Sequence, residues 1–351
     1  MIVLKSVLEQ FVSDLFHLAG CRPEEAMLVA KRLVAGNLAG YDSHGVIRVP
    51  LYLRLVREEK IFPNRHISVV SQIGAMAILD GNFGFGQVIG GEAVRYGIQQ
   101  ALESGMAVIG LRNSGHLGRI GDWAHMAADF GFVSLHFANT SGFGILVAPH
   151  GGSDRRLSAN PIAIGIPRPK TTTHIIVDIS TCAVSEGKIM VARNNEKTMP
   201  EGVMIDGYGK PTIDPNIFYA EPKGAILPLG GHKGFGLGIA CEIFAGALTG
   251  SGCSNPANET ASTLVNGMLS IYLNPVAFGS LASFDSEVDH FVEWVKDSPP
   301  SDGEQAVRMP GEQSANTTRY REKNGIPLDE KTLRSLHEEA ERLHYTERLG
   351  E

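Results

Sequence analysis

Apolar residues recur every three to four positions near the start of the chain, which is the spacing of an α-helix. Val7, Phe11 and Leu15 lie at i, i+4 and i+8, so a helix would place them on one face. The run Pro-Glu-Glu at 23–25 predicts the first turn of a second helix, because Pro is tolerated there and acids meet the positive end of the helix dipole. The pattern predicts a third helical segment over residues 43–60.

From residue 75 onward, short apolar runs bounded by turn residues alternate with patterns of helical period. Strands are predicted at 75–80, 106–111, 132–139, 162–167, 174–180 and 268–274. Helices are predicted at 87–104, 117–130, 184–195, 233–248, 286–296 and 329–347. Strands and helices that alternate in this way indicate an α/β layered fold.

The chain has 351 residues, which predicts about two domains at roughly 150 residues per domain. Residues 298–327 are rich in Pro, Gly and polar side chains, and we predict a long surface loop or linker there. We expect a helical region at 1–75, completed by the C-terminal segment 298–351, and an α/β region at 76–297.

Composition and charge narrow the class of protein. The sequence has 31 Lys and Arg against 38 Asp and Glu, and this net charge of −7 argues against broad binding to nucleic acid. The four Cys show no CxxC spacing and no HExxH or HxH pair is present, so we expect neither a disulfide framework nor a metal site. The first 18 residues carry charges, unlike a secretory signal, and 234–252 is too weakly apolar for a membrane span. We therefore expect a cytoplasmic protein.

The stretch 41–52 carries side chains suited to acid–base chemistry. On a continuous helix His44, Arg48 and Tyr52 would share one face. An imidazole exchanges a proton near neutral pH, a guanidinium pairs with a carboxylate, and a phenol donates one further hydrogen bond. Ser43 could cap this helix, whereas Pro50 would kink it and shift Tyr52. The alternative is a solvated helix face with a capping serine.

A glycine-rich turn at 113–121 follows a predicted strand. Gly115, Gly118 and Gly121 would let the backbone approach a ligand, and His116 stands in the middle of the turn. Ligands gather outside the carboxyl ends of strands in α/β sheets, so this turn is a candidate binding loop. The alternative is a tight turn with an exposed histidine.

Three further stretches could contact a ligand. Residues 228–236 lead into a helix whose free N–H groups, together with Lys233, suit a phosphate, although neither the P-loop nor the GxGxxG pattern is satisfied. Close helix packing through small residues is the alternative there. Asp178 opens the run Asp-Ile-Ser-Thr at a strand end, which offers a carboxylate and hydroxyls to a ribose or simply caps a turn. Alone, the run Met-Pro-Gly-Glu at 309–312 is only a turn.

Together these stretches resemble the type-2 malate/L-lactate dehydrogenase family, whose relatives include ureidoglycolate, sulfolactate and diketogulonate oxidoreductases and reductases of cyclic imino acids. The matching segments come in the family's order and span nearly the whole chain: 42–46 with Arg48 and Tyr52, 113–121, 160–163, 178–181, 230–236 and 310–312. The resemblance implies a dinucleotide-binding α/β fold that is not of the Rossmann type, with a central mixed sheet and a helical domain built from both terminal segments. It also implies a homodimer with sites near the subunit contact.

The resemblance further implies an NAD(P)-dependent oxidoreductase of 2-hydroxy, 2-oxo or imino acids, with site residues mostly in the 76–297 region. The substrate would contact Ser43, Arg48 and Tyr52. The dinucleotide, NAD or NADP, would contact His44, Gly118, Arg119, Ile120, Asn160, Asp178, Ile179, Ser180, Thr181, His232, Lys233, Gly234, Pro310, Gly311 and Glu312.

A mechanism follows as a hypothesis. Arg48 pairs with the substrate carboxylate, and a histidine takes the proton of the 2-hydroxyl while hydride passes to the nicotinamide. His44 and His116 are both candidates; we favour His116, with His44 close to the nicotinamide and Asp178 or Ser43 orienting an imidazole. The substrate and the choice between NAD and NADP stay open. The alternatives are an NADPH-dependent cyclic-imine reductase and, in another class, a non-catalytic nucleotide- or anion-binding protein.

Overall fold

A seven-stranded mixed sheet forms the centre of the computed structural model, which describes residues 1–350 except 143, 169–172, 259–263 and 304–305. The strand order is β2 (Ser68–Ile73), β3 (Met76–Asp80), β4 (Met106–Ser114), β11 (Leu264–Leu273), β5 (Val133–Gly142), β6 (Ile162–Ile166) and β7 (Ile175–Ile179). Only β3 and β4 pair in parallel within this sheet, and the other neighbours are antiparallel. The mixed sheet predicted from the resemblance is therefore confirmed.

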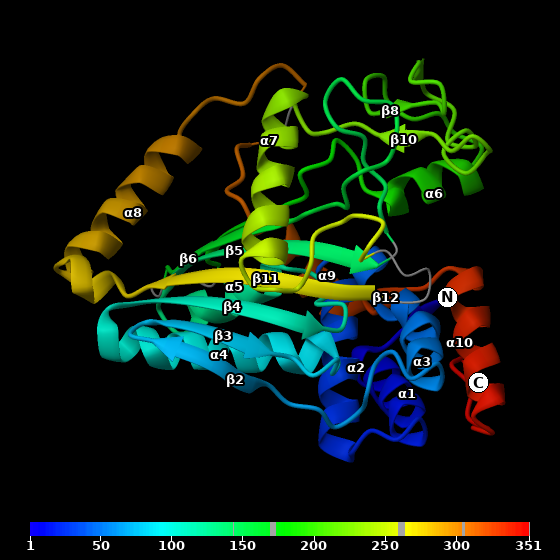
Figure 1. Cartoon of the computed structure of the whole chain (residues 1–351), viewed down its shortest axis with the longest axis horizontal. Coiled ribbons are helices and arrows are strands. Elements are labelled where there is room, and N and C mark those ends of the chain that lie inside the picture. Colours follow the sequence, from blue (N-terminus) through cyan, green and yellow to red (C-terminus); the bar gives the residue numbers. More distant parts are fainter. Residues whose placement is uncertain (143, 169–172, 259–263, 304–305, 351) are drawn as a thin grey trace.

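Helices cover both faces of this sheet (Figure 1). On one face α4 (Gly86–Ser104) and α5 (Gly121–Asp129) share a hydrophobic cluster with the strands, in which Trp123 and Tyr272 are almost completely buried. On the other face α7 (His232–Cys241) continues into the π-helical turn η3 (Glu242–Ala247), which contacts β4, β5 and β11. The helix predicted at 233–248 thus exists, with a π-helical last part.

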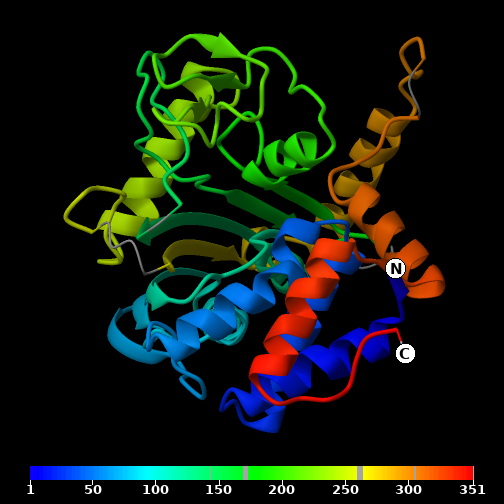
Figure 2. The same ribbon diagram turned by 90° about the vertical axis from the view of Figure 1, so that its right-hand side faces the viewer.

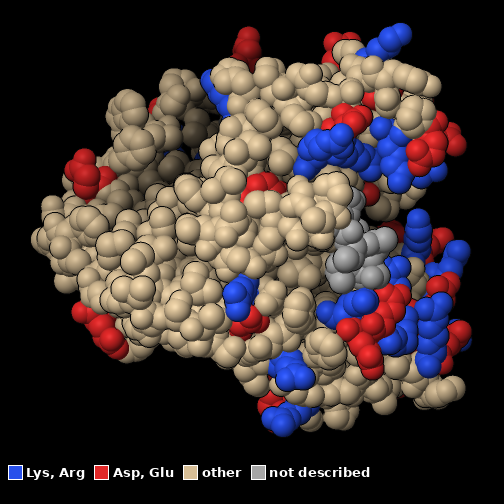
Figure 3. Space-filling view, in the orientation of Figure 1, with Lys and Arg blue, Asp and Glu red and all other residues tan. Residues whose placement is uncertain are grey.

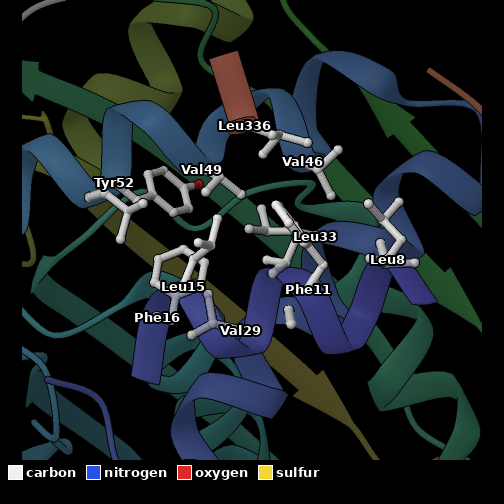
Figure 4. Packing of buried hydrophobic residues seen from close by; sticks show 14 of the residues in the cluster. Leu8, Phe11, Leu15, Phe16, Val29, Leu33, Val46, Val49, Tyr52 and Leu336 are labelled. Atoms are coloured by element: carbon white, nitrogen blue, oxygen red, sulfur yellow. The ribbon is translucent and has the colours of Figure 1, made fainter. Parts of the chain in front are cut away.

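The N- and C-terminal segments pack together as one helical layer beside the sheet (Figure 2). This layer contains α1 (Lys5–Leu18), α2 (Pro23–Leu38), α3 (Val49–Arg57), α9 (Glu312–Asn324) and α10 (Glu330–Arg342). The short strands β1 (Ile2–Val3) and β12 (Ile326–Pro327) pair and tie the two ends of the chain to each other. Figure 4 shows the apolar faces of α1, α2 and α3 meeting around Leu15, Phe16 and Leu33.

A smaller unit lies above the sheet, between β5 and α7 in the chain. It holds α6 (Glu186–Asn194) and a three-stranded sheet of β10 (Ala225–Ile226), β8 (Met204–Ile205) and β9 (Pro211–Thr212) around its own apolar cluster. After β11, the 3-10 turn η4 (Pro275–Phe278) leads to α8 (Leu281–Lys296), which projects from the body (Figure 1).

Three expectations about secondary structure need correction. Residues 298–327 are not only a loop, because α9 forms at Glu312–Asn324. None of the residues in α9 is fully buried, so its sequence lacks the apolar periodicity that predicts a helix. The predicted strands missed β2 (Ser68–Ile73), whose six residues are all exposed and alternate weakly. The helix predicted at 117–130 begins only at Gly121, because residues 115–120 form the ligand-facing turn described below.

Two further observations concern the sheet and the helices. His136 lies in β5 and is fully buried between the hydroxyls of Ser134 and Ser270. No helix within the described part of the chain is long and apolar enough to cross a membrane.

Candidate active site

The first motif does not form one continuous helix, which corrects the prediction for residues 43–60. It consists of two 3-10 turns, η1 (Asp42–His44) and η2 (Val46–Arg48), followed by α3. Between the two turns Gly45 is extended, and the Val46 amide donates to Asn37 Oδ1 at 2.8 Å instead of to a helical carbonyl. A Cβ on Gly45 would lie only 2.2 Å from that oxygen, so the break requires glycine.

The structure also corrects the predicted effects of Pro50 and Ser43 on this helix. Pro50 stands in the first turn of α3, where a missing N–H costs nothing, so it starts the helix rather than kinking it. The Ser43 side chain caps neither turn; its hydroxyl lies 3.2 Å from Nδ1 of the neighbouring His44.

The fold nevertheless brings the two candidate histidines together. The rings of His44 and His116 stack almost in parallel, with centroids 5.8 Å apart and an interplanar angle of 11°. Tyr52 reaches the same point from α3, and its hydroxyl lies 2.6 Å from Nδ1 of His116. Tyr52 is 1% exposed in the apolar cluster of the helical layer (Figure 4), whereas both histidines are only partly buried. The imidazoles can therefore meet a ligand while Tyr52 is fixed from behind.

Arg48 supplies a positive charge beside this histidine pair. Its Nε donates to the backbone carbonyl of Ser43 at 2.6 Å, which fixes the guanidinium next to His44. Burial, and then the Arg48 charge, lower the pKa of His44 to about 3 and lower the pKa of His116 well below its usual value. Both imidazoles are therefore neutral in the unliganded protein at neutral pH.

The glycine-rich turn shapes the other wall of the site. The amide of Leu117 donates to Oδ1 of Asn266 at 2.8 Å, and Gly118 has a φ of +72°, which favours glycine. On the facing helix, a Cβ at Gly86 would lie 2.2 Å from the carbonyl oxygen of His116. Close packing of α4 against the turn thus holds His116 in place.

Arg119 and Asp178 lie together at the end of this turn. Arg119 Nε donates to Asp122 Oδ1 at 2.7 Å, and its guanidinium lies 4.9 Å from the ring centroid of Tyr41. The Gly121 amide donates to the Asp178 carboxylate, and a Cβ on Gly121 would lie 2.5 Å from that carboxylate. Burial raises the pKa of Asp178 to about 6, although Arg119 opposes the change.

A cavity of about 360 Å³ opens beside this pair, within the range of small-molecule sites. Arg119, Asp178 and Gly311 line it together with residues of α9. The 310–312 loop reaches β7 through a 3.0 Å hydrogen bond from the Ile176 amide to the Pro310 carbonyl. Glu312 points elsewhere, since it accepts from Lys296 at 2.7 Å and from the Met309 amide at 3.1 Å.

The far wall of the cavity contains two histidines that the sequence analysis did not place in a site. His125 Nδ1 and His174 Nε2 lie 3.0 Å and 3.2 Å from the two oxygens of the Asp129 carboxylate. His125 is exposed and lines the cavity. Sequence spacing does not bring the two histidines together, because His174 is distant from His125 in the chain.

The remaining cofactor candidates form a second group around the start of α7. The Leu229 amide donates to the Thr181 carbonyl at 2.9 Å, and a Cβ on Gly234 would lie 2.6 Å from that carbonyl oxygen. The start of α7 at residues 232–234 therefore packs against the strand end at residues 178–181. This strand end includes Ile179 and Ser180. His232 contacts the His150 ring, with centroids 6.1 Å apart. Neither His232 nor Lys233 lines the 360 Å³ cavity.

Asn160 occupies a different position from the other candidates. Its side-chain amide donates to Glu242 Oε1 at 2.9 Å and to the Gly238 carbonyl at 3.1 Å, and it is completely buried. Its amide therefore links β6 to α7 and η3. Ile120, which precedes α5, is 3% exposed and belongs to the core below the turn.

Two residues close to His116 and Ser43, Gln87 and Gly187, were not predicted from the sequence. Gln87, in the first turn of α4, donates to the Tyr52 hydroxyl at 3.1 Å and is 3% exposed. At the start of α6, a Cβ on Gly187 would lie 3.1 Å from Cβ of Ser43. A polar residue at a buried helix position is the only signal that could have identified Gln87.

The donors around the cavity fit a dinucleotide: a guanidinium, a partly buried carboxylate and backbone at a glycine position. The charge of Arg119, which lines the cavity, also acts on His44 of the histidine pair. Such a site defines a class, the dinucleotide-dependent oxidoreductases that act on a small acid. Among the described residues, no group of three or more His, Cys, Asp or Glu is arranged to hold a metal ion.

Comparison with known proteins gives the family. The family model for malate/L-lactate dehydrogenase matches residues 3–337. Hydroxycarboxylate dehydrogenase B of Escherichia coli is 40% identical over 326 residues, which cover 92% of this chain and 89% of that protein. The sulfolactate dehydrogenase structure from Methanocaldococcus jannaschii superposes with a TM-score of 0.86 at 31% identity, covering 98% of both chains. A Δ1-piperideine-2-carboxylate reductase from Pseudomonas syringae gives a TM-score of 0.83 at 26% identity, covering 97% of this chain and 100% of that chain.

The chain belongs to the malate/L-lactate dehydrogenase family. It is an NAD(P)-dependent oxidoreductase that acts on the CH–OH group of 2-hydroxy acids. The resemblance inferred from the sequence motifs is confirmed, and so are the enzyme class and the α/β fold.

Proposed function

We propose that His116 carries the proton and Arg48 binds the substrate carboxylate in this reaction. The observation that supports this most strongly is the convergence of Tyr52, His116 and Arg48 on one point. Tyr52 engages Nδ1 of His116, which leaves Nε2 as the ring nitrogen for the substrate proton. His44 stacks on the other side, and Ser43 fixes Arg48 through its carbonyl.

In oxidation, the 2-hydroxyl gives its proton to His116, and in reduction the imidazolium returns a proton to the carbonyl oxygen. When bound, the nicotinamide accepts or supplies the hydride at C2. Arg48 orients the carboxylate. Burial, together with the Arg48 charge, keeps the imidazoles neutral, and a bound substrate anion would offset the contribution of that charge. Arg119, Asp178 and the Gly311 backbone would hold the dinucleotide, and 232–234 would contact its other end.

Absorbance of the reduced nicotinamide tests this function. Purified protein is mixed with NADH or NADPH and a panel of 2-oxo acids that includes oxaloacetate, pyruvate and sulfopyruvate. We expect consumption with at least one oxo acid, and the faster nucleotide identifies the cofactor preference. The proposal would be contradicted if no acid caused consumption of reduced nicotinamide and neither dinucleotide raised the melting temperature.

The structural likeness to a Δ1-piperideine-2-carboxylate reductase supports a second candidate, an NADPH-dependent reductase of cyclic imino acids. A ring imine next to a carboxylate presents the same two groups to His116 and Arg48 as a 2-oxo acid does. Cyclic imines therefore belong in the same panel. Consumption of NADPH with an imine and none with any oxo acid would favour this reductase.

We also propose that the protein forms a homodimer in the cytoplasm without binding nucleic acid, as the family resemblance implies. Along α7 and η3, Leu237, Ile243 and Leu248 are exposed, and on α8 Phe291 and Trp294 are 56% and 73% exposed. The face of the molecule that carries α7 and α8 shows few charges, whereas charged side chains gather over the helical layer (Figure 3). Large apolar side chains exposed on a face with few charges are typical of a protein interface.

Light scattering at several concentrations tests the dimer. We expect twice the chain mass of 37.7 kDa for the wild type and a shift towards the monomer for Trp294→Glu. Tyr208→Glu is the matched control, because Tyr208 is a 77% exposed aromatic residue on the β8–β9 turn, distant in the fold from α8. A wild type that remains monomeric at all concentrations would contradict the proposal.

A further inference from the structure

A chain of hydrogen bonds runs from His116 into the protein interior. The Tyr52 hydroxyl lies 2.6 Å from Nδ1 of His116, and Gln87 Nε2 lies 3.1 Å from the same hydroxyl. Gln87 Nε2 also donates to the backbone carbonyl of His116 at 3.4 Å. Because Tyr52 and Gln87 are 1% and 3% exposed, solvent does not compete for these bonds. The position of each proton in the chain is therefore determined by its neighbours.

These contacts assign the proton on His116. The amide nitrogen of Gln87 only donates, so the oxygen of Tyr52 accepts from it. Among the described residues the Tyr52 proton has no other hydrogen-bond acceptor than Nδ1 of His116, so Tyr52 donates to Nδ1. A neutral His116 consequently carries its proton on Nε2, the nitrogen that faces the substrate. Such a ring can donate a hydrogen bond to the carbonyl oxygen of a 2-oxo acid, but it cannot accept the proton of a 2-hydroxy acid.

A second arrangement of the same side chains has the opposite effect. Among the described residues, the Oε1 atom of Gln87 is buried without a hydrogen-bond partner, which is unfavourable. A half-turn of the carboxamide exchanges Oε1 with Nε2 and leaves the backbone in place. Oε1 then accepts from Tyr52, whose oxygen accepts from Nδ1–H of His116, and the Nε2 atom of His116 is free to take a proton. The half-turn gives up the 3.4 Å contact with the His116 carbonyl and brings Oε1 next to that carbonyl oxygen, so without a ligand the arrangement seen here is the favoured one.

We propose that Gln87 is a positioning residue that sets, through Tyr52, which ring nitrogen of His116 carries the proton. The arrangement seen here keeps the ring neutral and holds a 2-oxo acid through Nε2–H. In the turned arrangement the hydroxyl proton of a 2-hydroxy acid moves to Nε2 as hydride leaves C2, and Nδ1–H of the resulting imidazolium donates to Tyr52. Reduction reverses these transfers. The inference rests on the proposed role of His116.

Nitrogen NMR of ¹⁵N-histidine-labelled protein tests the proton position directly. The His116 signals are assigned by their loss in His116→Gln. In the wild type we expect the proton of the neutral ring on Nε2. In Gln87→Glu, whose carboxylate only accepts, we expect it on Nδ1. The exposed residue Gln99 lies on the same helix, so Gln99→Glu is the matched control and should leave His116 unchanged.

Two results would overturn the proposal. One is the same ring tautomer in Gln87→Glu as in the wild type. The other is a full effect of Gln87→Glu in a Tyr52→Phe background, since a through-space charge would persist there and a hydrogen-bond relay would not. Gln87→Met provides a second test without a charge; it leaves Nδ1 as the acceptor for Tyr52 and should keep the proton on Nε2.

Kinetics give an independent readout. In Gln87→Glu the carboxylate, acting through Tyr52, favours the protonated form of His116 and so raises its pKa. Oxidation needs the unprotonated ring, so we expect the rising limb of kcat/KM against pH to move to higher pH by at least about one unit. In Gln87→Met we expect oxidation kcat to fall about tenfold with a smaller change in KM. Unchanged profiles in both variants would contradict the proposal. If the wild type reduced no oxo acid, the proposed function would fail, while the NMR result would still decide the tautomer.

Discussion

The His116 side of the site is packed and hydrogen-bonded within the protein, whereas the Arg119–Asp178 side opens onto a cavity of about 360 Å³. On the packed side, Tyr52 and Gln87 fix a ring nitrogen from behind. On the open side, a partly buried carboxylate is held in an environment that raises its pKa to about 6. Proton transfer needs a ring with one defined orientation, and ligand binding needs polar groups that the protein leaves incompletely paired. The two sides therefore contribute differently to stability and to function.

The largest effect is expected at Arg48, beside the histidine pair. Arg48→Ala should lower kcat/KM for carboxylate substrates about 10³-fold, because two charge-assisted hydrogen bonds are worth roughly 3–5 kcal/mol. Steady-state rates measure this loss, and Arg48→Lys should recover only part of it, since Lys lacks the planar fork. A rate within tenfold of the wild type for Arg48→Ala would place the carboxylate elsewhere.

On the packed side, Tyr52→Phe should destabilise the protein. The change removes the shorter of the two hydrogen bonds of Gln87 Nε2 and the partner of Nδ1 of His116 in a buried place, which costs roughly 1–3 kcal/mol. Urea unfolding measures the change in the free energy of unfolding. Tyr320→Phe on exposed α9 is the control and should cost almost nothing. Equal stability of Tyr52→Phe and wild type would show that the packed side is not held by this hydroxyl.

On the open side, Asp178→Asn should raise the free energy of unfolding of the unliganded protein, whereas Tyr52→Phe should lower it. Because the folded state raises the pKa of Asp178 to about 6, the ionised form is disfavoured there, and removing the charge should gain about 1–2 kcal/mol at pH 8. The gain should shrink as the pH falls through 6 towards 4, where wild-type Asp178 takes up a proton. Thermal melts across this pH range measure it.

The same variant should bind the dinucleotide more weakly, as shown by a smaller rise in melting temperature with NADH or NADPH. A variant less stable than the wild type at pH 8 would mean that Arg119 outweighs burial, and that the open side is stabilised by its charges.

Sequence patterns predicted the elements with strong apolar periodicity and missed those without it. The apolar faces of α1 and α2 and the runs of β4 and β5 are clear in the sequence, because these elements are half or fully buried. By contrast α9, with no buried residue, and β2, exposed along its length, owe their structure to neighbours. Spacing alone could not reveal them.

The candidate site shows the same limit. His44, Arg48 and Tyr52 were identified from helical spacing, yet the segment is broken at Gly45 and the residues converge for a different reason. Asn37, 8 residues before Gly45, replaces the helical hydrogen bonds and has no motif of its own. Gln87 and His174 join the site only through tertiary contacts, which no pattern along one chain contains.

The most direct test of the account compares His116→Gln with His44→Gln in one reaction. Single-turnover reduction of the best 2-oxo acid is followed by loss of reduced-nicotinamide absorbance, with both variants saturated with nucleotide. The account predicts that His116→Gln slows this step at least about 10²-fold, as expected for a lost general acid, whereas His44→Gln slows it less and mainly weakens nucleotide binding. A rate close to the wild type in His116→Gln, with activity lost in His44→Gln, would assign the proton to His44 and contradict the account.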